Sequence, residues 1–364
     1  MDNSAAQPHT ESPQAELRRD RSGRRPTSRR GRSTSPEAVA RRRRRRPWFI
    51  SGLIAAFAGL AVLIGYPLYL AAVFENQTTD IPDAFPDERL RPAVSEDESV
   101  NVLLLGSDTR GAVGQDVDSI RGQRSDTILL VHIPADRSGI AVMSIMRDSW
   151  VEIPGEGENK VNAALSLGGV PLVVQTVEQL VEARIDRVAI IDFEGFGGMT
   201  DALGGVTLTN SQGFRSSVDG RFYEEGPLTL NGDQALAFVR ERQAFRNGDY
   251  QRVVNQQAFL SGLMSGILNA ETLTDPARIT GLVTEVSPYV SVDSGFSAAV
   301  VASLGVELRN VRADDVTMFT LPTTGTGTRR AQSVVLIDEV QLDIIRTSLR
   351  DGTFLSYEPP PPPL

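Results

Sequence analysis

The apolar residues of this chain fall into short continuous runs bounded by polar turns, with longer stretches at helical spacing between the runs. Continuous apolar runs of this length indicate buried strands. We expect such strands at residues 100–105, 127–133, 140–146, 188–193 and 316–321. Pro134 and Gly139 separate the second run from the third. These residues predict a tight connection between the two strands.

Apolar positions spaced three or four residues apart predict the helices. Pro171 begins one such stretch, at the position where proline is favoured in a helix, and the stretch continues to Ala183. Asn231 is placed to cap a short helix through Phe238. A short helix is expected to follow the strand at 188–193 and to end at Gly204. Further helices are expected near residues 249–268, 275–284, 294–305 and 337–348. Because strands and helices alternate, we expect an α/β layered fold with a mixed sheet.

Residues 48–74 carry no charge. A bilayer core needs roughly 20 apolar residues in a helix, so this segment predicts one transmembrane helix. Trp48 lies at one end and Tyr66 and Tyr69 lie toward the other, as in an aromatic belt. The apolar part of a cleaved signal peptide would be only about 7–15 residues long, so we expect a retained signal-anchor. Arg41 to Arg46 precede the segment, which predicts a cytoplasmic N-terminus and an extracytoplasmic domain.

Composition divides the rest of the chain. Residues 1–47 hold 14 arginines and almost no large apolar residues, which predicts a disordered basic tail. As topology determinants these arginines need no nucleic acid partner. Residues 75–98 are rich in proline and acids and are expected to be a linker that lifts the domain off the membrane. Residues 99–352 form the expected globular domain, and residues 353–364 a proline-rich tail.

Composition also excludes several kinds of site. The chain has no cysteine, which rules out disulfides, thiolate metal sites and cysteine nucleophiles. His9 and His132 are the only histidines, so a Ser-His-Asp triad could use only His132. Lys160 is the single lysine among 37 basic residues, so phosphate recognition must fall mainly to arginine. The chain has neither a Walker sequence nor a nucleophile elbow.

Polar motifs flank the first three predicted strands. Asp108 follows the first strand, Asp126 precedes the second and Arg147 follows the third. If these strands are antiparallel neighbours, the three side chains collect at one edge of the sheet. Two carboxylates at such an edge would suit Mg²⁺. Taken alone, either aspartate could simply cap a loop.

A second group of polar residues lies further along the chain. Arg240 and Arg242 are two positions apart, so an extended segment would aim both the same way. Arg252 and Gln256 share one face of the next predicted helix. Converging guanidinium groups bind phosphate, although a solvated, salt-bridged face is the alternative. The helix face continues as a stripe that is either core or the lining of a lipid channel: Leu260, Leu263, Met264 and Ile267.

Taken in order, the segments GSDTR, RSDT, SIMRD, Lys160-Val161-Asn162, VRER and GDYQR…NQQ resemble the LytR-CpsA-Psr envelope proteins. The resemblance covers about residues 99–350. It implies an α-β-α sandwich with a central mixed sheet and a hydrophobic pocket for a polyprenyl chain. Met146 stands where proline is usual, and Asn255 stands where many members carry another arginine.

The resemblance implies a phosphotransferase that ligates a glycopolymer from a polyprenyl-pyrophosphate carrier to peptidoglycan at the cell membrane, using Mg²⁺ or Mn²⁺. Asp108 and Asp126 are the implied metal ligands, and Arg147, Arg240 and Arg242 are expected to share in catalysis with them. The implied pyrophosphate-binding residues are Arg124, Arg147, Arg240, Arg242, Arg252 and Gln256.

Two alternatives remain open. A polyprenyl-pyrophosphate pyrophosphatase would need the same residues and would use water as the acceptor. A non-catalytic transcriptional regulator linked to the envelope would use its basic tail instead. The polar clusters lie in the domain that is expected outside the cell, and the tail has no folded DNA-binding motif, which favours an enzyme.

Overall fold

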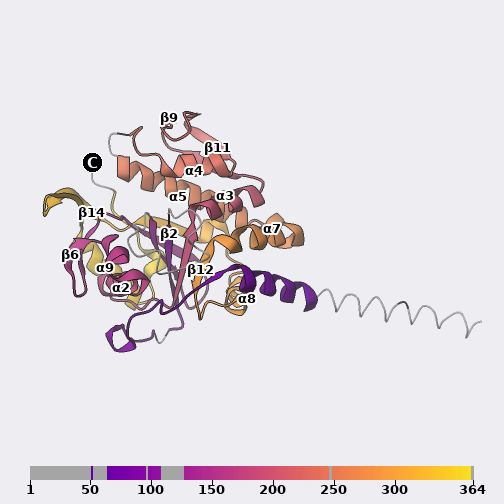
Figure 1. Cartoon of the computed structure of the whole chain (residues 1–364), viewed down its shortest axis with the longest axis horizontal. Helices are drawn as coiled ribbons and strands as arrows, with labels where there is room; N and C mark the ends of the chain where they lie inside the picture. The colour runs from indigo at the N-terminus through magenta and orange to yellow at the C-terminus, as the bar shows by residue number, and fades with distance from the viewer. Residues whose placement is uncertain (1–50, 52–63, 96, 108–126, 246–247, 362–364) are drawn as a thin grey trace, which may run out of the picture. The chain divides into compact units, whose positions relative to one another are not determined.

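The computed structural model describes residues 51, 64–95, 97–107, 127–245 and 248–361. At its centre is a seven-stranded mixed sheet in the order β1-β12-β7-β2-β3-β4-β13 (Figure 1). The strands are β1 (Thr79–Ile81), β2 (Val100–Ser107), β3 (Thr127–Ile133), β4 (Ile140–Ile145), β7 (Arg187–Asp192), β12 (Val290–Asp293) and β13 (Val316–Thr320). Strands β2, β3 and β4 are antiparallel neighbours, which is the pairing that would gather the polar motifs at the ends of these strands at one edge.

Helices cover both faces of this sheet. They are α2 (Ala163–Val181), α3 (Phe193–Ala202), α4 (Gly232–Arg240), α5 (Gly248–Ile267), α6 (Ala270–Thr274), α7 (Pro276–Val286), α8 (Ala298–Glu307) and α9 (Glu339–Arg350). Successive residues of a strand point to opposite faces. Leu103 and Leu105 therefore pack in one core with α2 and α9, and Leu104 packs in another with α5 and α8. The mixed α/β fold with three layers is as expected.

A smaller unit of short strands stands beside α4. It comprises β8 (Val206–Asn210), β9 (Phe214–Arg215), β10 (Phe222–Tyr223) and β11 (Gly226–Leu230), paired as β8 with β11 and β9 with β10. Its core is aromatic: the rings of Phe214 and Tyr223 are stacked, and both contact Phe238 of α4. This core fixes the position of α4. Two further hairpins were not predicted: β5 (Trp150–Ile153) with β6 (Gly157–Lys160), and β14 (Thr323–Arg329) with β15 (Gln332–Ile337).

Helix α2 begins earlier than the sequence indicated. It starts at Ala163 and is interrupted at Gly169, whose φ of 70° is unfavourable for any side chain larger than hydrogen. The stretch from Pro171 is thus its second part. Among the described residues, α2 is the one helix long and apolar enough to cross a membrane, but 56% of it is buried, so it is a core helix.

The predicted membrane span lies mostly outside the described residues, although residues 64–77 are helical. The segment that follows, expected to be a linker, adds β1 to the sheet beside β12. Arg91 of the same segment forms an ion pair of 2.8 Å with buried Glu178 of α2. At the other end of the domain, Phe354 and Tyr357 are buried, so the core extends past residue 352.

Candidate functional site

The ends of three central strands meet at one edge of the sheet. Gly106 of β2 pairs with Thr127 of β3, and Ser107 pairs with Asp192 of β7. Asp108, Arg124 and Asp126 lie outside the described residues, and their predicted roles remain predictions. Asp108 follows Ser107 directly in the chain, and Asp126 directly precedes Thr127.

Asp192 is a carboxylate that the sequence reasoning missed. It is buried, at 3% exposure, and ends β7 at the same edge as Thr127. An acidic residue at the end of the apolar run 188–193 was the signal that could have identified it. Among the described residues, no group of three or more His, Asp or Glu side chains could hold a metal ion.

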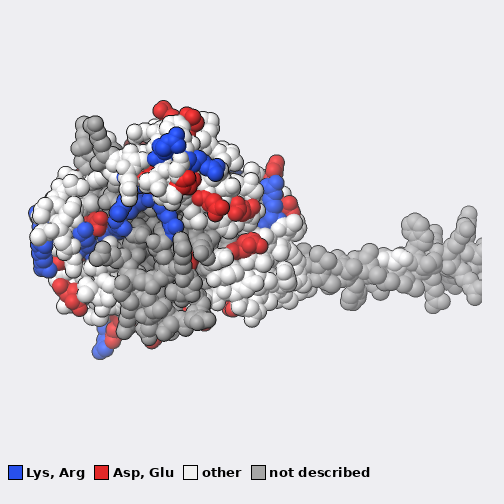
Figure 2. Space-filling view, turned by 45° about the horizontal axis from the view of Figure 1, so that its top comes forward, with Lys and Arg blue, Asp and Glu red and all other residues white. Residues whose placement is uncertain are grey.

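A polar pocket lies beside this edge, with about 340 Å³ of empty space including its open mouth. Its lining brings together two motifs that are far apart in the chain: Arg147 and Asp148 follow β4, and Arg252 and Gln256 lie on α5. Arg252 is only 8% exposed. Figure 2 shows basic side chains gathered in the middle of one face of the domain. The structure thus brings Arg147, Arg252 and Gln256 together in one pocket.

The turn that carries Arg147 is held from two sides. The backbone N–H of Asn162 donates to the carbonyl of Arg147 over 3.2 Å, and that of Val335 donates to the carbonyl of Asp148 over 2.9 Å. Lys160 of β6 places its Nζ 2.9 Å from Oδ1 of Asp148. The segment Lys160-Val161-Asn162, which sequence analysis singled out without a role, thus supports the turn that carries Arg147.

Arg240 and Arg242 are not both in an extended segment, contrary to the expectation. Arg240 is the last residue of α4, whose start is fixed by a capping box between Asn231 and Gln234. Arg242 is exposed. Between them, Glu241 is buried. Burial alone would raise the pKa of its carboxyl, but hydrogen bonds from Ala244 and the Ser217 backbone and hydroxyl hold that pKa below its usual range.

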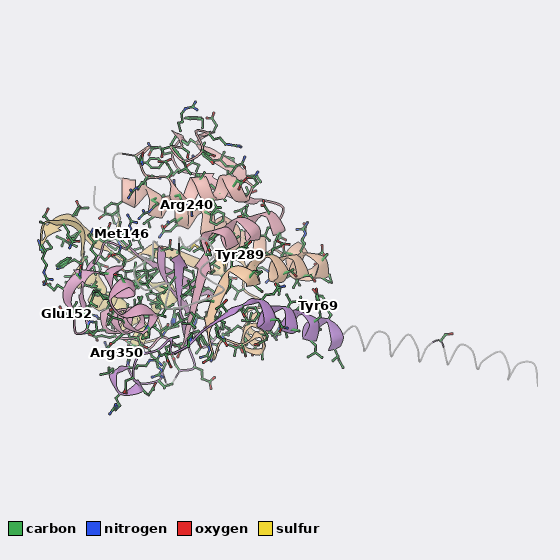
Figure 3. The ribbon with its side chains drawn as sticks, viewed as in Figure 1. Tyr69, Met146, Glu152, Arg240, Tyr289 and Arg350 are labelled. Atoms are coloured by element: carbon green, nitrogen blue, oxygen red, sulfur yellow. The ribbon has the colours of Figure 1, made fainter. Side chains whose placement is uncertain are left out.

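Figure 3 places Arg240 and Met146 at the boundary between the helices around α4 and the central sheet. Met146 itself is buried, at 4% exposure, and packs with Val253 and Val335. Its replacement of the usual proline therefore adds an apolar contact under the pocket.

Three successive amides fasten α5 to its surroundings. Asn255 is buried and donates to the carbonyl of Phe238 over 3.4 Å. Gln256 donates to the carbonyl of Val239 over 3.5 Å, and Gln257 donates to Oγ1 of Thr320 over 2.9 Å. The departure at Asn255 thus has a structural role in the α4–α5 contact, and Gln256 remains at the pocket.

An apolar pocket adjoins the polar one, with about 440 Å³ of empty space including its opening. The residues that it adds are almost entirely hydrophobic: Phe196, Val239, Phe259 and Leu260. The two pockets share Thr127, Leu129, Ser144 and Gln256. A ligand could therefore place a charged group by the arginines and an apolar chain beneath α5. Of the stripe on α5, Leu260 lines this pocket and Leu263 is core.

His132 lies elsewhere. It pairs with Asn101, at the opposite end of β3 from Thr127, and its Nδ1 is 2.8 Å from Oδ1 of Asn101. Its ring packs edge-on against Phe354. This position excludes His132 as a base at the pocket.

A family model described as the LytR_cpsA_psr family matches residues 69–351. The chain belongs to this family. Among its relatives is a "Probable cell wall biosynthesis protein LcpB" of Corynebacterium glutamicum, which is 30% identical over 307 residues, covering 82% of this chain and 72% of that protein. A polyisoprenyl-teichoic acid–peptidoglycan teichoic acid transferase TagU of Oceanobacillus iheyensis is 32% identical over 258 residues, covering 67% of this chain and 76% of the relative.

Solved structures of the LytR_cpsA_psr type share the fold. TagV of B. subtilis superposes with a TM-score of 0.59 at 24% identity, over 72% of this chain and 100% of TagV. A structure described as "TagT bound to LI-WTA" gives a TM-score of 0.56 at 23% identity, over 76% of this chain and 99% of the other.

Proposed function

We propose that the protein is a phosphotransferase that ligates a glycopolymer from a polyprenyl-pyrophosphate carrier to peptidoglycan. The observation that supports this most directly is the wall shared by an arginine-lined polar pocket and an apolar pocket. A polyprenyl pyrophosphate has the same division, since its charged head is attached to a wholly apolar chain. The name of the relative TagU, a polyisoprenyl-teichoic acid–peptidoglycan teichoic acid transferase, agrees with this assignment.

In this proposal the donor binds with its pyrophosphate at Arg147, Arg252 and Gln256, which line the polar pocket. Arg240, the last residue of α4, and Arg242 would contact the same phosphates. Guanidinium groups match pairs of phosphate oxygens with two parallel hydrogen bonds, which a lysine cannot do. The low exposure of Arg252 strengthens such contacts because little water competes for them. The first isoprene units lie against Phe259 and Leu260. Burying them contributes several kcal/mol, at roughly 25 cal/mol per Å² of apolar area.

The reaction is a displacement at phosphorus. A peptidoglycan hydroxyl oxygen forms a bond to the sugar-linked phosphorus, and the bond from that phosphorus to the bridging oxygen breaks. Polyprenyl phosphate leaves with the electron pair, and the hydroxyl proton passes to an oxygen of that leaving phosphate. Arginines fixed around the phosphates stabilise the negative charge that moves onto the bridging oxygen.

Mg²⁺ or Mn²⁺ belongs to the proposal, with Asp108 and Asp126 as the residues that would hold it. Carboxylate oxygens are the ligands that Mg²⁺ prefers, and the pairing of Gly106 with Thr127 brings the two flanking strand ends together. When bound, the ion would neutralise phosphate charge. Residues 48–74 would anchor the enzyme, with its domain outside the membrane. There it would meet a donor that is itself embedded in lipid.

Lipid retention by the purified full-length protein tests the donor class. We expect solvent extracts of the wild type to contain polyprenyl phosphates, identified by mass spectrometry. Leu260→Glu should lose this lipid, because a carboxylate in the apolar pocket repels the chain. Val340→Glu is the matched control, since Val340 on α9 is 71% exposed. Extracts free of polyprenyl phosphates from every variant would contradict the assignment.

Product analysis separates transfer from hydrolysis. The protein is incubated with a polyprenyl-pyrophosphate-linked glycan, with and without peptidoglycan. A transferase joins glycan to peptidoglycan and releases polyprenyl phosphate only when the acceptor is present. Equal release without acceptor would instead identify a pyrophosphatase acting at the same site.

A further inference from the structure

Helix α8 is apolar except for Ser303 and Glu307, yet it lies at the surface. Its sequence is AAVVASLGVE, with one charge at the very end. A surface helix normally turns a polar face to water. Here Leu304 packs inward, whereas Val306 is 63% exposed and Val301 39% exposed. An exposed apolar face of this kind marks a contact surface.

The helical segment 64–77 is fastened beside α8. Glu75 accepts a hydrogen bond of 2.8 Å from the backbone N–H of Ala298, at the start of α8. The hydroxyl of Tyr66 donates to the carbonyl of Pro276, at the start of α7, over 2.7 Å. Figure 1 shows this segment lying next to α8. The helical segment 64–77 also exposes large apolar side chains, with exposed fractions of 54% for Ile64, 63% for Leu68 and 52% for Tyr69.

The composition of the chain indicates what covers these faces. No charge occurs between Trp48 and Phe74, so the segment fastened to α8 is the end of the proposed membrane span. A helix rises 1.5 Å per residue, so the 27 uncharged residues 48–74 would be about 40 Å long as a helix. This length matches a bilayer together with its headgroup regions, which puts Glu75 and the start of α8 at the outer headgroup level. Figure 2 shows a largely uncharged surface at the lower right of the domain.

The core beneath α8 is continuous with the apolar pocket. Leu304 and Leu308 pack in the same cluster as Leu260 and Met264 of α5, and Leu260 lines that pocket. A lipid surface at α8 would therefore adjoin the apolar layer that leads to the proposed donor site.

The charges near α8 suit a headgroup region. Glu307 is paired with Arg137 over 2.7 Å. Arg309 and Arg312, just past the helix, are exposed and donate to backbone carbonyls. Of the acidic residues that follow, Asp315 accepts a hydrogen bond from the backbone of Arg312. Two exposed guanidinium groups beside an apolar face are arranged to meet lipid phosphates.

We propose that α8 and the exposed face of residues 64–77 form a membrane-contact surface, with Val301 and Val306 in the lipid. The inference rests on the proposed membrane span and extends it to the catalytic domain. The domain then lies on the bilayer, so that a lipid-linked donor can reach the site with its tail always in an apolar environment.

Site-specific labelling of the full-length protein tests this, since the chain has no cysteine of its own. Val306→Cys, Ala55→Cys and Ser333→Cys would each carry a bimane fluorophore in nanodiscs that contain lipids with brominated chains. We expect the label at residue 306 to lose most of its fluorescence, as at residue 55, and the label at residue 333 on exposed β15 to keep it. A label at 306 that behaves like the one at 333, with residue 55 quenched, overturns the α8 contact and leaves the span intact. If the label at residue 55 is not quenched, both the α8 contact and the membrane span are overturned.

Two further results bear on the proposal. Val301→Glu combined with Val306→Glu should lower turnover roughly tenfold with a membrane-embedded donor and leave turnover with a water-soluble short-chain donor unchanged. Val340→Glu serves as the control for both donors. If the protein instead forms a dimer in detergent that Val306→Glu dissociates, and residue 306 stays unquenched in single-copy nanodiscs, a second copy covers α8 and the membrane contact is overturned.

Discussion

The ammonium group of Lys160 lies 2.9 Å from Oδ1 of Asp148, which joins the only lysine of the chain to the residue after Arg147. The other carboxylate oxygen of Asp148 is 3.7 Å from Nε of Arg147. Asp148 therefore lies between two cations, and Lys160 fixes the carboxylate against which Arg147 rests. Both side chains of the Lys160–Asp148 pair are about one fifth exposed, at 21% and 19%.

Lys160→Met should lower transfer activity roughly tenfold, because Asp148 would then turn fully to Arg147 and compete with the phosphate. The free energy of unfolding should change by no more than about 1 kcal/mol, since a partly exposed ion pair contributes little. Lys160→Arg keeps the charge and should restore most of the activity. If Lys160→Met has a lower melting temperature but unchanged activity per folded molecule, the Lys160–Asp148 pair stabilises the fold and does not assist transfer.

Arg240→Lys and Arg242→Lys should each lower kcat/KM at least tenfold, because lysine keeps the charge but loses the paired hydrogen bonds to phosphate. Thermal melting should stay within a few degrees of the wild type. Arg221→Lys is the matched control, because its side chain is 55% exposed on the small unit of strands away from the pocket. If both site variants melt early yet retain full activity per folded molecule, the arginines stabilise the fold and do not bind phosphate.

Asp126→Ala should abolish divalent metal binding, measured by calorimetric titration of Mn²⁺ into the purified protein. Asp108→Ala should do the same, because Mg²⁺ and Mn²⁺ are held chiefly by carboxylates. Turnover of the wild type should stop in EDTA and return when Mg²⁺ is added. Full activity of the double variant in EDTA would overturn the metal assignment.

Acid should destabilise the fold through His132. Burial lowers the pKa of this histidine from its ordinary value of 6.5 to about 4. As the pH falls below about 6.5, His132 binds a proton in the unfolded chain, whereas in the folded protein it stays neutral until the pH approaches 4. The free energy of unfolding therefore decreases as the pH falls from about 6.5 to about 4. The loss should be on the order of 3 kcal/mol.

Urea unfolding at pH 7 and pH 4.5 measures this loss. His132→Gln has no titratable ring, so its stability should fall less between the two pH values than that of the wild type. The carboxylates titrate in both proteins and cancel in the comparison. An equal fall in the two proteins would show that His132 does not cause the pH dependence.

The local elements could be predicted from short stretches of the amino-acid sequence. Strands β3 and β4 could be placed because each is a continuous apolar run, and Pro134 and Gly139 between them enforce a turn. Asn231 and Gln234 specify the start of α4 through their own side chains. Such features depend on residues that are close together in the chain, so they can be predicted without knowledge of the tertiary structure. The ordered motifs were sufficient to indicate the family for the same reason.

Contacts between residues far apart in the chain could not be predicted in this way. The ion pair of Lys160 with Asp148 exists because the β5–β6 hairpin folds back on the end of β4, and no periodicity reports such a contact. Asn255 points into α4 because Phe238 is packed there by the rings of a separate unit. The shared wall of the two pockets likewise combines β3, β4 and α5. Hydrophobic spacing records which face of an element is buried, but which neighbour buries it is settled by packing across the whole chain.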